Sequence, residues 1–148
     1  MRVGIVGLGL IGGSLAKAYS RAGGHEVLAC ELDAKVLAIA QVEGAVQGEL
    51  TADNMSGCDL ILIAISPAAA IRWLREAAPM LREGQLVIDC CGTKRDICKA
   101  GFDLAERYGF TFAGGHPMAG THNSGFAYSR ADMFEEAPMV VVPRHYDD

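Results

Sequence analysis

The stretch VGIVGLGLIGGSLA, residues 3–16, decides the fold of this chain. Residues 3–6 have the composition of a short buried strand, and residues 11–21 place apolar side chains at helical spacing. Between them, residues 7–12 read Gly-Leu-Gly-Leu-Ile-Gly. A strand, a G-x-G-x-x-G turn and a helix in that order are typical of a dinucleotide-binding unit. The alternative is a plain glycine turn with no ligand.

Each residue of this turn has an expected role. Gly7 permits the tight turn, Gly9 lets a pyrophosphate approach the backbone, and Gly12 lets helix and strand pack closely. Leu10 and Ile11 open the helix, whose free N–H groups and positive dipole end attract phosphates. We therefore expect these five residues to bind the cofactor.

The second predicted strand, residues 27–30, leads to Glu31, 19 residues beyond Gly12. A carboxylate at this place can accept hydrogen bonds from the adenosine ribose hydroxyls, and it would repel a 2′-phosphate. Leu32 offers no cation to offset that repulsion. The sequence therefore predicts NAD rather than NADP, although Lys35 is close enough in sequence to leave NADP open.

The rest of the chain alternates short apolar runs with helix-like segments. We expect strands at 60–65, 85–90, 110–113 and 138–142, and helices at 34–42, 67–81 and 93–108. This alternation predicts an α/β fold: a Rossmann-type, doubly wound, mostly parallel sheet with helices on both faces. We expect one domain over residues 1–143, followed by a polar tail, 144–148.

Composition excludes several classes of protein. The chain has 148 residues, 51% of them hydrophobic, which excludes a disordered chain, and its net charge of −5 argues against a nucleic-acid partner. Five cysteines without CxxC or Cys/His spacing predict no metal site and fit a reducing cytoplasm. No apolar run reaches the length of a membrane span, so we expect a cytoplasmic protein with no membrane association.

A second motif, GGHPMAGTHNSG at residues 114–125, follows the strand predicted at 110–113. It places His116 where ligands bind in such sheets, just beyond the carboxyl ends of the strands. An imidazole, with an ordinary pKa near 6.5, suits removal of a hydroxyl proton as the adjacent carbon gives up a hydride. Taken alone, a His-Pro step also fits a turn histidine bonded to backbone.

Together, GLGLIGGSLA and GGHPMAGTHNSG resemble the nucleotide-binding domain of the prephenate/arogenate dehydrogenase family, over residues 1–143. The resemblance implies NAD-dependent oxidative decarboxylation of prephenate or arogenate in tyrosine biosynthesis, with His116 as the catalytic base. Thr121 would contact substrate or nicotinamide. Ser124 matches the family pattern too, and it could equally cap a following helix.

One segment departs from the family pattern. The family commonly carries a serine two positions before Lys94, and Gly92 stands there, so we expect Gly92 beside the cofactor and Thr93 as the nearest hydroxyl to the substrate. Lys94 is a candidate for substrate or cofactor contact, with a solvated helix-start lysine as the alternative.

Residues 64–66, Ala64, Ile65 and Ser66, resemble the family segment that passes beneath the cofactor, and they equally fit an ordinary helix start. Trp73 is expected in the core, and Cys90 and Cys91 are expected to pack at a strand end.

Two other functions stay open at this level. One is another Rossmann dehydrogenase of the β-hydroxyacid type, which would leave the His-Pro-Met-Ala-Gly-Thr string unexplained. The other is an NAD-binding module without turnover of its own. Family members carry a helical C-terminal domain that forms a homodimer and supplies an arginine for the substrate carboxylates. We expect that domain to be absent from these 148 residues, so the chain alone should turn over its small-molecule substrate poorly.

Overall fold

The structure, a computed structural model, describes residues 1–145. Residues 146–148, most of the predicted polar tail, lie outside the described part. The strands are β1 (Arg2–Val6), β2 (Glu26–Cys30), β3 (Gly48–Glu49), β4 (Leu60–Ile63), β5 (Leu86–Asp89), β6 (Thr111–Pro117) and β7 (Met139–Val142). The helices are α1 (Leu10–Ala22), α2 (Ala34–Val42), α3 (Pro67–Ala77) and α4 (Arg95–Tyr108), with short 3-10 turns η1 (Met55–Gly57), η2 (Ala78–Met80) and η3 (Phe126–Tyr128).

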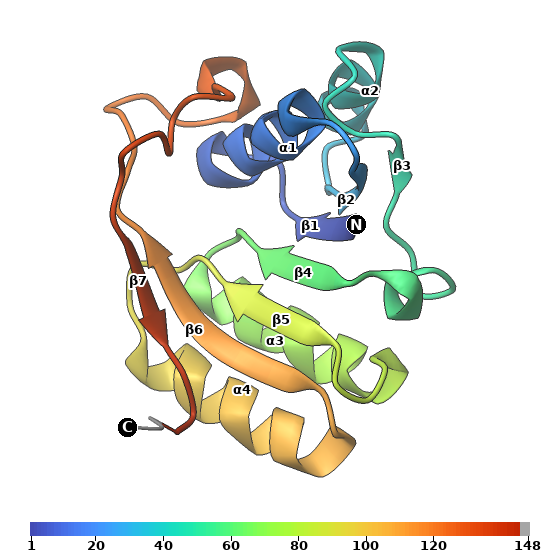
Figure 1. The fold of residues 1–148 in the computed structure, drawn as a ribbon, viewed down its shortest axis with the longest axis vertical. Helices are drawn as coiled ribbons and strands as arrows, with labels where there is room; N and C mark the ends of the chain where they lie inside the picture. Colours follow the sequence, from blue (N-terminus) through green and yellow to red (C-terminus); the bar gives the residue numbers. More distant parts are fainter. Residues whose placement is uncertain (146–148) are drawn as a thin grey trace.

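These strands form one sheet in the order β3-β2-β1-β4-β5-β6-β7. All neighbouring pairs are parallel except β6 with β7, which is antiparallel. In Figure 1, α1 and α2 lie on one side of the sheet and α3 and α4 on the other. The predicted doubly wound, mostly parallel Rossmann-type fold is therefore confirmed.

The core has two halves because alternate residues of a strand point to opposite faces of the sheet. On β4, Leu60 and Leu62 join the cluster beneath α1 and α2, while Ile61 and Ile63 join the cluster beneath α3 and α4. All four are buried, which explains why this strand is apolar at every position.

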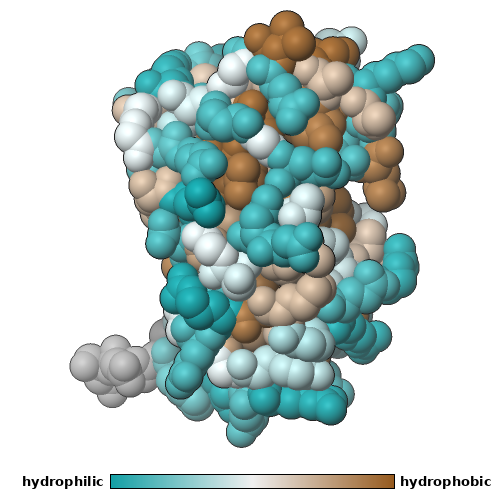
Figure 2. All heavy atoms as spheres, turned by 90° about the vertical axis from the view of Figure 1, so that its right-hand side faces the viewer, coloured by the Kyte–Doolittle hydropathy of each residue, from teal (hydrophilic) through white to brown (hydrophobic). Residues whose placement is uncertain are grey.

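The surface is mostly hydrophilic on the face that Figure 2 shows, with brown atoms gathered in its upper part, where α2 lies. The large exposed apolar residues of α2 are Ile39 and Val42, the latter 89% exposed. None of the described helices is long and apolar enough to cross a membrane.

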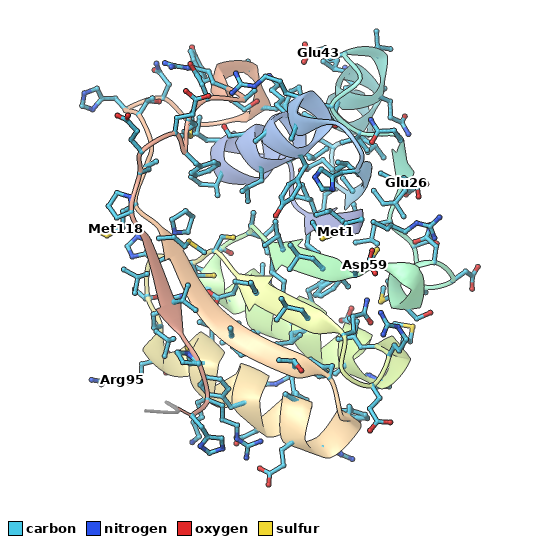
Figure 3. All side chains as sticks on the ribbon, viewed as in Figure 1. Met1, Glu26, Glu43, Asp59, Arg95 and Met118 are labelled. Carbon is cyan, nitrogen blue, oxygen red and sulfur yellow. The ribbon has the colours of Figure 1, made fainter. Side chains whose placement is uncertain are left out.

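The carboxyl ends of the parallel strands gather at one edge of the sheet, on the left in Figure 1. Figure 3 labels Met118, which follows β6, on that side, and Met1, which precedes β1, on the opposite side. Ligands of open α/β sheets bind outside the carboxyl ends of the strands, so we expect the functional residues on that side.

Strand β6 is longer than predicted. The expected strand ended at residue 113, but β6 continues to Pro117 because residues 114–117 pair with β7. His116 therefore lies inside a strand rather than after one. The two consecutive glycines, 114 and 115, permit close contact with α4, β5 and β7.

Smaller differences concern element ends. The short strand β3 was not predicted, α3 ends at Ala77 with the 3-10 turn η2 following from Ala78, and the strand predicted at 60–65 ends at Ile63. Helix α4 begins at Arg95, which leaves Thr93 outside it. These elements are short or end within a residue or two of a proline, a loop or a cap, where local patterns are weakest.

Between β6 and β7 the chain crosses the outer side of α1. The Lys17 ammonium donates to the carbonyl of Ser129 at 3.0 Å, and the N–H of Arg130 donates to Ser14 Oγ at 2.9 Å. This segment contains only the 3-10 turn η3, capped by Gly125 without a side-chain bond, so the helix that Ser124 was to cap is absent from it.

Candidate functional site

The glycine turn has the geometry predicted from its spacing. Gly7 has a φ of +89°, and a Cβ there would lie 2.7 Å from the carbonyl oxygen of Ala64, so only glycine fits. A Cβ on Gly12 would collide with the carbonyl of Gly7, so this glycine brings α1 against the end of β1. A Cβ on Gly9 would meet nothing within 4 Å, which leaves space in front of the turn.

Helix α1 begins directly after this turn. Its N-cap is Gly9, which has no side chain to bond the first N–H groups, and its first turn carries no acidic residue. The N–H groups of Leu10 and Ile11 have no partner within the helix. The helix start therefore presents free donors and a partial positive charge beside open space, which suits a phosphate group.

Glu31 is fixed close to the glycine turn. Its carboxylate accepts the N–H of Leu8 at 2.7 Å through one oxygen and the N–H of Asp33 at 3.1 Å through the other. Each oxygen keeps a further lone pair for another donor. Asp33 also caps α2, because its side chain accepts the N–H of Lys35 at 2.9 Å. The predicted carboxylate is thus in place at the end of β2.

A cavity of about 480 Å³ opens between the end of β2 and the first turns of α3. Gly7, Glu31 and Ile65 line it, as do Arg72 and Trp73. Trp73, expected in the core, is half-buried: it packs against the core cluster and also forms part of this wall. Arg72 and Trp73 were missed as site residues, although Ala69, Arg72, Trp73 and Glu76 have the spacing of one helical face directly after a strand end.

Residues 64–66 lie between the glycine turn and Cys91, which precedes Gly92 in the loop that faces His116. A Cβ on Gly12 would lie 3.2 Å from the Ala64 Cβ, and the N–H of Ala64 donates to Val6 O at 2.8 Å. The thiol of Cys91 donates to the carbonyl of Ile65 at 3.5 Å. Ser66 is exposed and forms no side-chain cap bond at the start of α3. Ala64 and Ile65 therefore lie against the turn, whereas Ser66 points into solvent.

His116 is half-buried in β6, and Gly92 faces it. A Cβ built on Gly92 would lie 3.8 Å from His116 Nε2 and near no other atom within 4 Å. The position that the family commonly fills with serine is therefore open space in front of the imidazole. A Cβ on Gly120 would lie 4.0 Å from Leu10 Cδ2, so the chain beyond His116 returns to the start of α1.

Lys94 is neither solvated nor free. Its side chain is 19% exposed, and its ammonium donates to the Asp89 carboxylate and to the carbonyl of Gly115. Asp89 is completely buried at the end of β5 and was not singled out from the sequence. A charged residue that ends a buried strand needs a partner, and that requirement was the available signal. Substrate contact by Lys94 stays a prediction.

Three predicted hydroxyl residues lie on the surface. Thr93 is exposed just before α4. Thr121 forms a local turn, in which its Oγ1 accepts the N–H of Asn123 and donates to its carbonyl, both at 3.2 Å. Ser124 is exposed as well. None of the contacts in the described residues joins these side chains to His116, so their roles remain predictions.

The thiols near the site are not activated. Burial raises the pKa of the Cys90 thiol to about 12 and that of Cys91 to about 11. Both stay protonated at neutral pH, which agrees with packing rather than nucleophilic roles. Within residues 1–145, no cluster of three His, Cys, Asp or Glu side chains could hold a metal ion.

The parallel sheet, the glycine turn against a helix start and the fixed carboxylate at the end of β2 define a nucleotide-binding domain of the Rossmann type. The sequence model of the family described as "Prephenate dehydrogenase, nucleotide-binding domain" matches residues 15–148. The chain belongs to this family, as its two motifs predicted.

Individual relatives agree with this assignment. A prephenate dehydrogenase of Lactococcus lactis is 32% identical over 141 residues, which cover 93% of this chain and 40% of that protein. The arogenate dehydrogenase of Synechocystis superimposes with a TM-score of 0.88 at 28% identity, over 100% of this chain and 52% of that one. A prephenate dehydrogenase from A. aeolicus, solved in complex with hydroxyphenyl propionate and NAD+, gives a TM-score of 0.79 at 28% identity, over the same shares. The chain thus spans about half the length of these proteins or less.

Proposed function

We propose that this chain is the NAD-binding half of a dehydrogenase that oxidatively decarboxylates prephenate or arogenate. The observation that carries the proposal is the placement of two features at one edge of the sheet: the glycine turn with Glu31, and His116 facing open space at Gly92. Membership of the prephenate dehydrogenase family supports it.

The residues present fit NAD. The free N–H groups at the start of α1 would hold the pyrophosphate, and Glu31 would accept hydrogen bonds from the adenosine ribose. The cavity next to Glu31 also carries Glu49 and Glu76 on its wall, which disfavour a 2′-phosphate, against the single cation Arg72. NAD, when bound, supplies the acceptor for a hydride.

His116 would act on the substrate hydroxyl. As the ring carbon that bears this hydroxyl loses a hydride, Nε2 takes the hydroxyl proton and a carbonyl forms. The carboxylate on the opposite ring carbon leaves as CO2, and the electron pair of the broken C–C bond restores the aromatic ring as the new carbonyl becomes a phenolate. The phenolate takes back the proton that Nε2 accepted and becomes a phenol. Holding and returning this proton is the step that this chain's own side chains would carry out.

The test is turnover with prephenate and with arogenate, followed by the absorbance of reduced nicotinamide. We expect slow turnover by the 148 residues alone and faster turnover by a longer protein that also carries a helical domain, which we expect to form the homodimer. His116→Asn in the longer protein should lower kcat by about 10²-fold or more, with NAD affinity nearly unchanged. An equal loss of both would indicate a structural histidine.

A second candidate is an NAD-binding module without turnover. It is favoured by the state of Lys94, the cation bonded to the residue before His116, because its ammonium already has two acceptors. Both candidates predict NAD binding. Only the first predicts that adding prephenate or arogenate to the longer protein generates reduced nicotinamide.

A further inference from the structure

The residue before His116 is held by a buried ion pair. The Asp89 carboxylate accepts the N–H of Gly115 at 3.2 Å, and the Lys94 ammonium donates to the carbonyl of the same residue. Asp89 and Lys94 are also bonded to each other. Both backbone groups of Gly115 are therefore engaged by two charged side chains that are paired with one another.

These side-chain contacts begin where the backbone pairing of β5 with β6 ends. Backbone pairing of β5 with β6 stops at Ile88 and Ala113. Beyond that point the Asp89 carboxylate replaces the missing backbone partner. On its other side, β6 pairs with β7, where His116 stands opposite Val140. Because backbone groups alternate in direction along a strand, His116 is fixed through β7 and its neighbour Gly115 is fixed through the ion pair.

Position 115 requires glycine because the neighbouring strands leave no room for a Cβ. A Cβ there would collide with the carbonyl of Asp89 and would lie 2.8 Å from Ile88 Cγ2 and from Met139 Cε. The strands approach each other more closely here than any side chain allows. The close approach lets the Asp89 carboxylate reach the backbone of β6 directly.

The same carboxylate also fixes the loop that faces His116. Its Oδ2 accepts the N–H of Cys91 at 3.0 Å, and the next residue is Gly92, which lies in front of His116 Nε2. One buried carboxylate thus bonds the residue before His116 and the residue before Gly92.

We propose that Asp89 and Lys94 are positioning residues that hold the His116 imidazole and the Gly92 loop in register. A buried ion pair adds little net stability compared with apolar side chains of similar size, so stability alone gives weak grounds for keeping one here. The proposal rests on the proposed role of His116, but its test needs no turnover.

The experiment uses the nuclear Overhauser effect between the His116 ring protons and the α-protons of Gly92 in the 148-residue chain. The chain has four histidines, and His116→Asn identifies the ring signals. The decisive variant is Asp89→Leu/Lys94→Met, because it removes both contacts to Gly115 and leaves the net charge unchanged. We expect it to stay folded, with a Tm near that of the parent chain, while the cross-peak is lost and the His116 ring signals shift.

Two further variants complete the test. Asp89→Asn keeps an oxygen that can accept the N–H of Gly115, so it should weaken the cross-peak less than the double exchange. Glu106→Gln breaks the exposed ion pair with Arg144 close to the end of β7 and should leave the cross-peak intact.

If the double variant is folded and keeps the cross-peak at full intensity, the proposal is overturned. Asp89 and Lys94 would then contribute only to packing. Should the double variant not fold, Asp89→Asn decides: an unchanged cross-peak contradicts the proposal, and a weakened one supports it. If the cross-peak behaves as expected but His116→Asn leaves kcat unchanged in the longer protein, the proposed function fails while the positioning stands.

Discussion

The glycine turn and the His116 end of β6 lie at the same edge of one sheet, but their backbones differ: the turn leaves N–H groups free, and the strand end has its backbone groups bonded. The turn lacks side chains at Gly7, Gly9 and Gly12, and its helix start leaves backbone N–H groups free. At Gly115, by contrast, both backbone groups are engaged by Asp89 and Lys94.

The difference follows from what each region has to do. A region that binds phosphate with its main chain needs exposed N–H groups and no Cβ in front of them. A region that acts with one side chain needs the backbone beneath that side chain to be fixed, because a misplacement of about 1 Å can cost about 10²-fold in rate. Substitutions in the two regions should therefore have different effects on stability and on NAD binding.

The largest effect is expected at Gly12. In Gly12→Ala the new Cβ collides with the Gly7 carbonyl and must move α1 away from β1. We expect a loss of about 2–4 kcal/mol in the free energy of unfolding and no measurable NAD binding. Denaturant unfolding and calorimetry measure the two quantities.

The matched control is Gly9→Ala, whose Cβ enters open space. It should cost about 1 kcal/mol of stability or less, because alanine is a poor N-cap, while still weakening NAD binding. NAD binding at full affinity in Gly9→Ala would show that the open space is not where the pyrophosphate lies.

An intermediate effect is expected at Glu31. Glu31→Gln keeps an oxygen that can accept the N–H of Leu8, but it removes the charge that opposes a 2′-phosphate. We expect the preference for NAD over NADP to fall about 10-fold, with stability nearly unchanged. Titration with both cofactors measures the ratio, and an unchanged preference would shift the discrimination to Glu49 and Glu76.

A smaller effect is expected at Gly92, on the His116 side. Gly92→Ser places a side chain in open space, so stability should change by no more than about 0.5 kcal/mol. The serine hydroxyl comes within reach of His116 Nε2, and we expect the ring signals to shift. An unfolded Gly92→Ser variant would contradict the geometry described for this loop.

The smallest effect at neutral pH is expected from the buried thiols, whose influence on stability appears only at alkaline pH. Burial raises the pKa of Cys90 to about 12, at the His116 side, and that of Cys30 to about 11, at the glycine turn. Unfolded thiols ionise near pH 8.5, so from there to about pH 12 the folded chain binds more protons and the free energy of unfolding falls as pH rises. Cys90→Ala should flatten this decline more than Cys30→Ala does. An equal change in both variants would show that burial does not differ between the two regions.

The turn was predictable from sequence, whereas the strand end was predictable only in part. Residues 7–12 follow a local rule in which each glycine has its own steric cause. The glycines at 114 and 115 have their causes on distant segments, α4, β5 and β7, so the sequence ended the strand at residue 113 and missed the extension of β6. The contact of Asp89 with Gly115 was hidden likewise, because it spans 26 residues of chain.

The cavity wall shows the same limit. Trp73 has the apolar character of a core residue, and only the arrangement of α3 against the ends of β1 and β2 shows that it borders the cavity beside Glu31. Side chains whose surroundings come from distant segments carry little local signal.

If the glycine turn and Glu31 make this chain an NAD-binding domain, calorimetric titration of the 148 residues with NAD and NADP will detect it. We expect saturable binding of one NAD per chain, lost in Gly12→Ala, with NADP bound at least about 10-fold more weakly. No binding of NAD by the folded chain, or equal binding of the two cofactors, would contradict it.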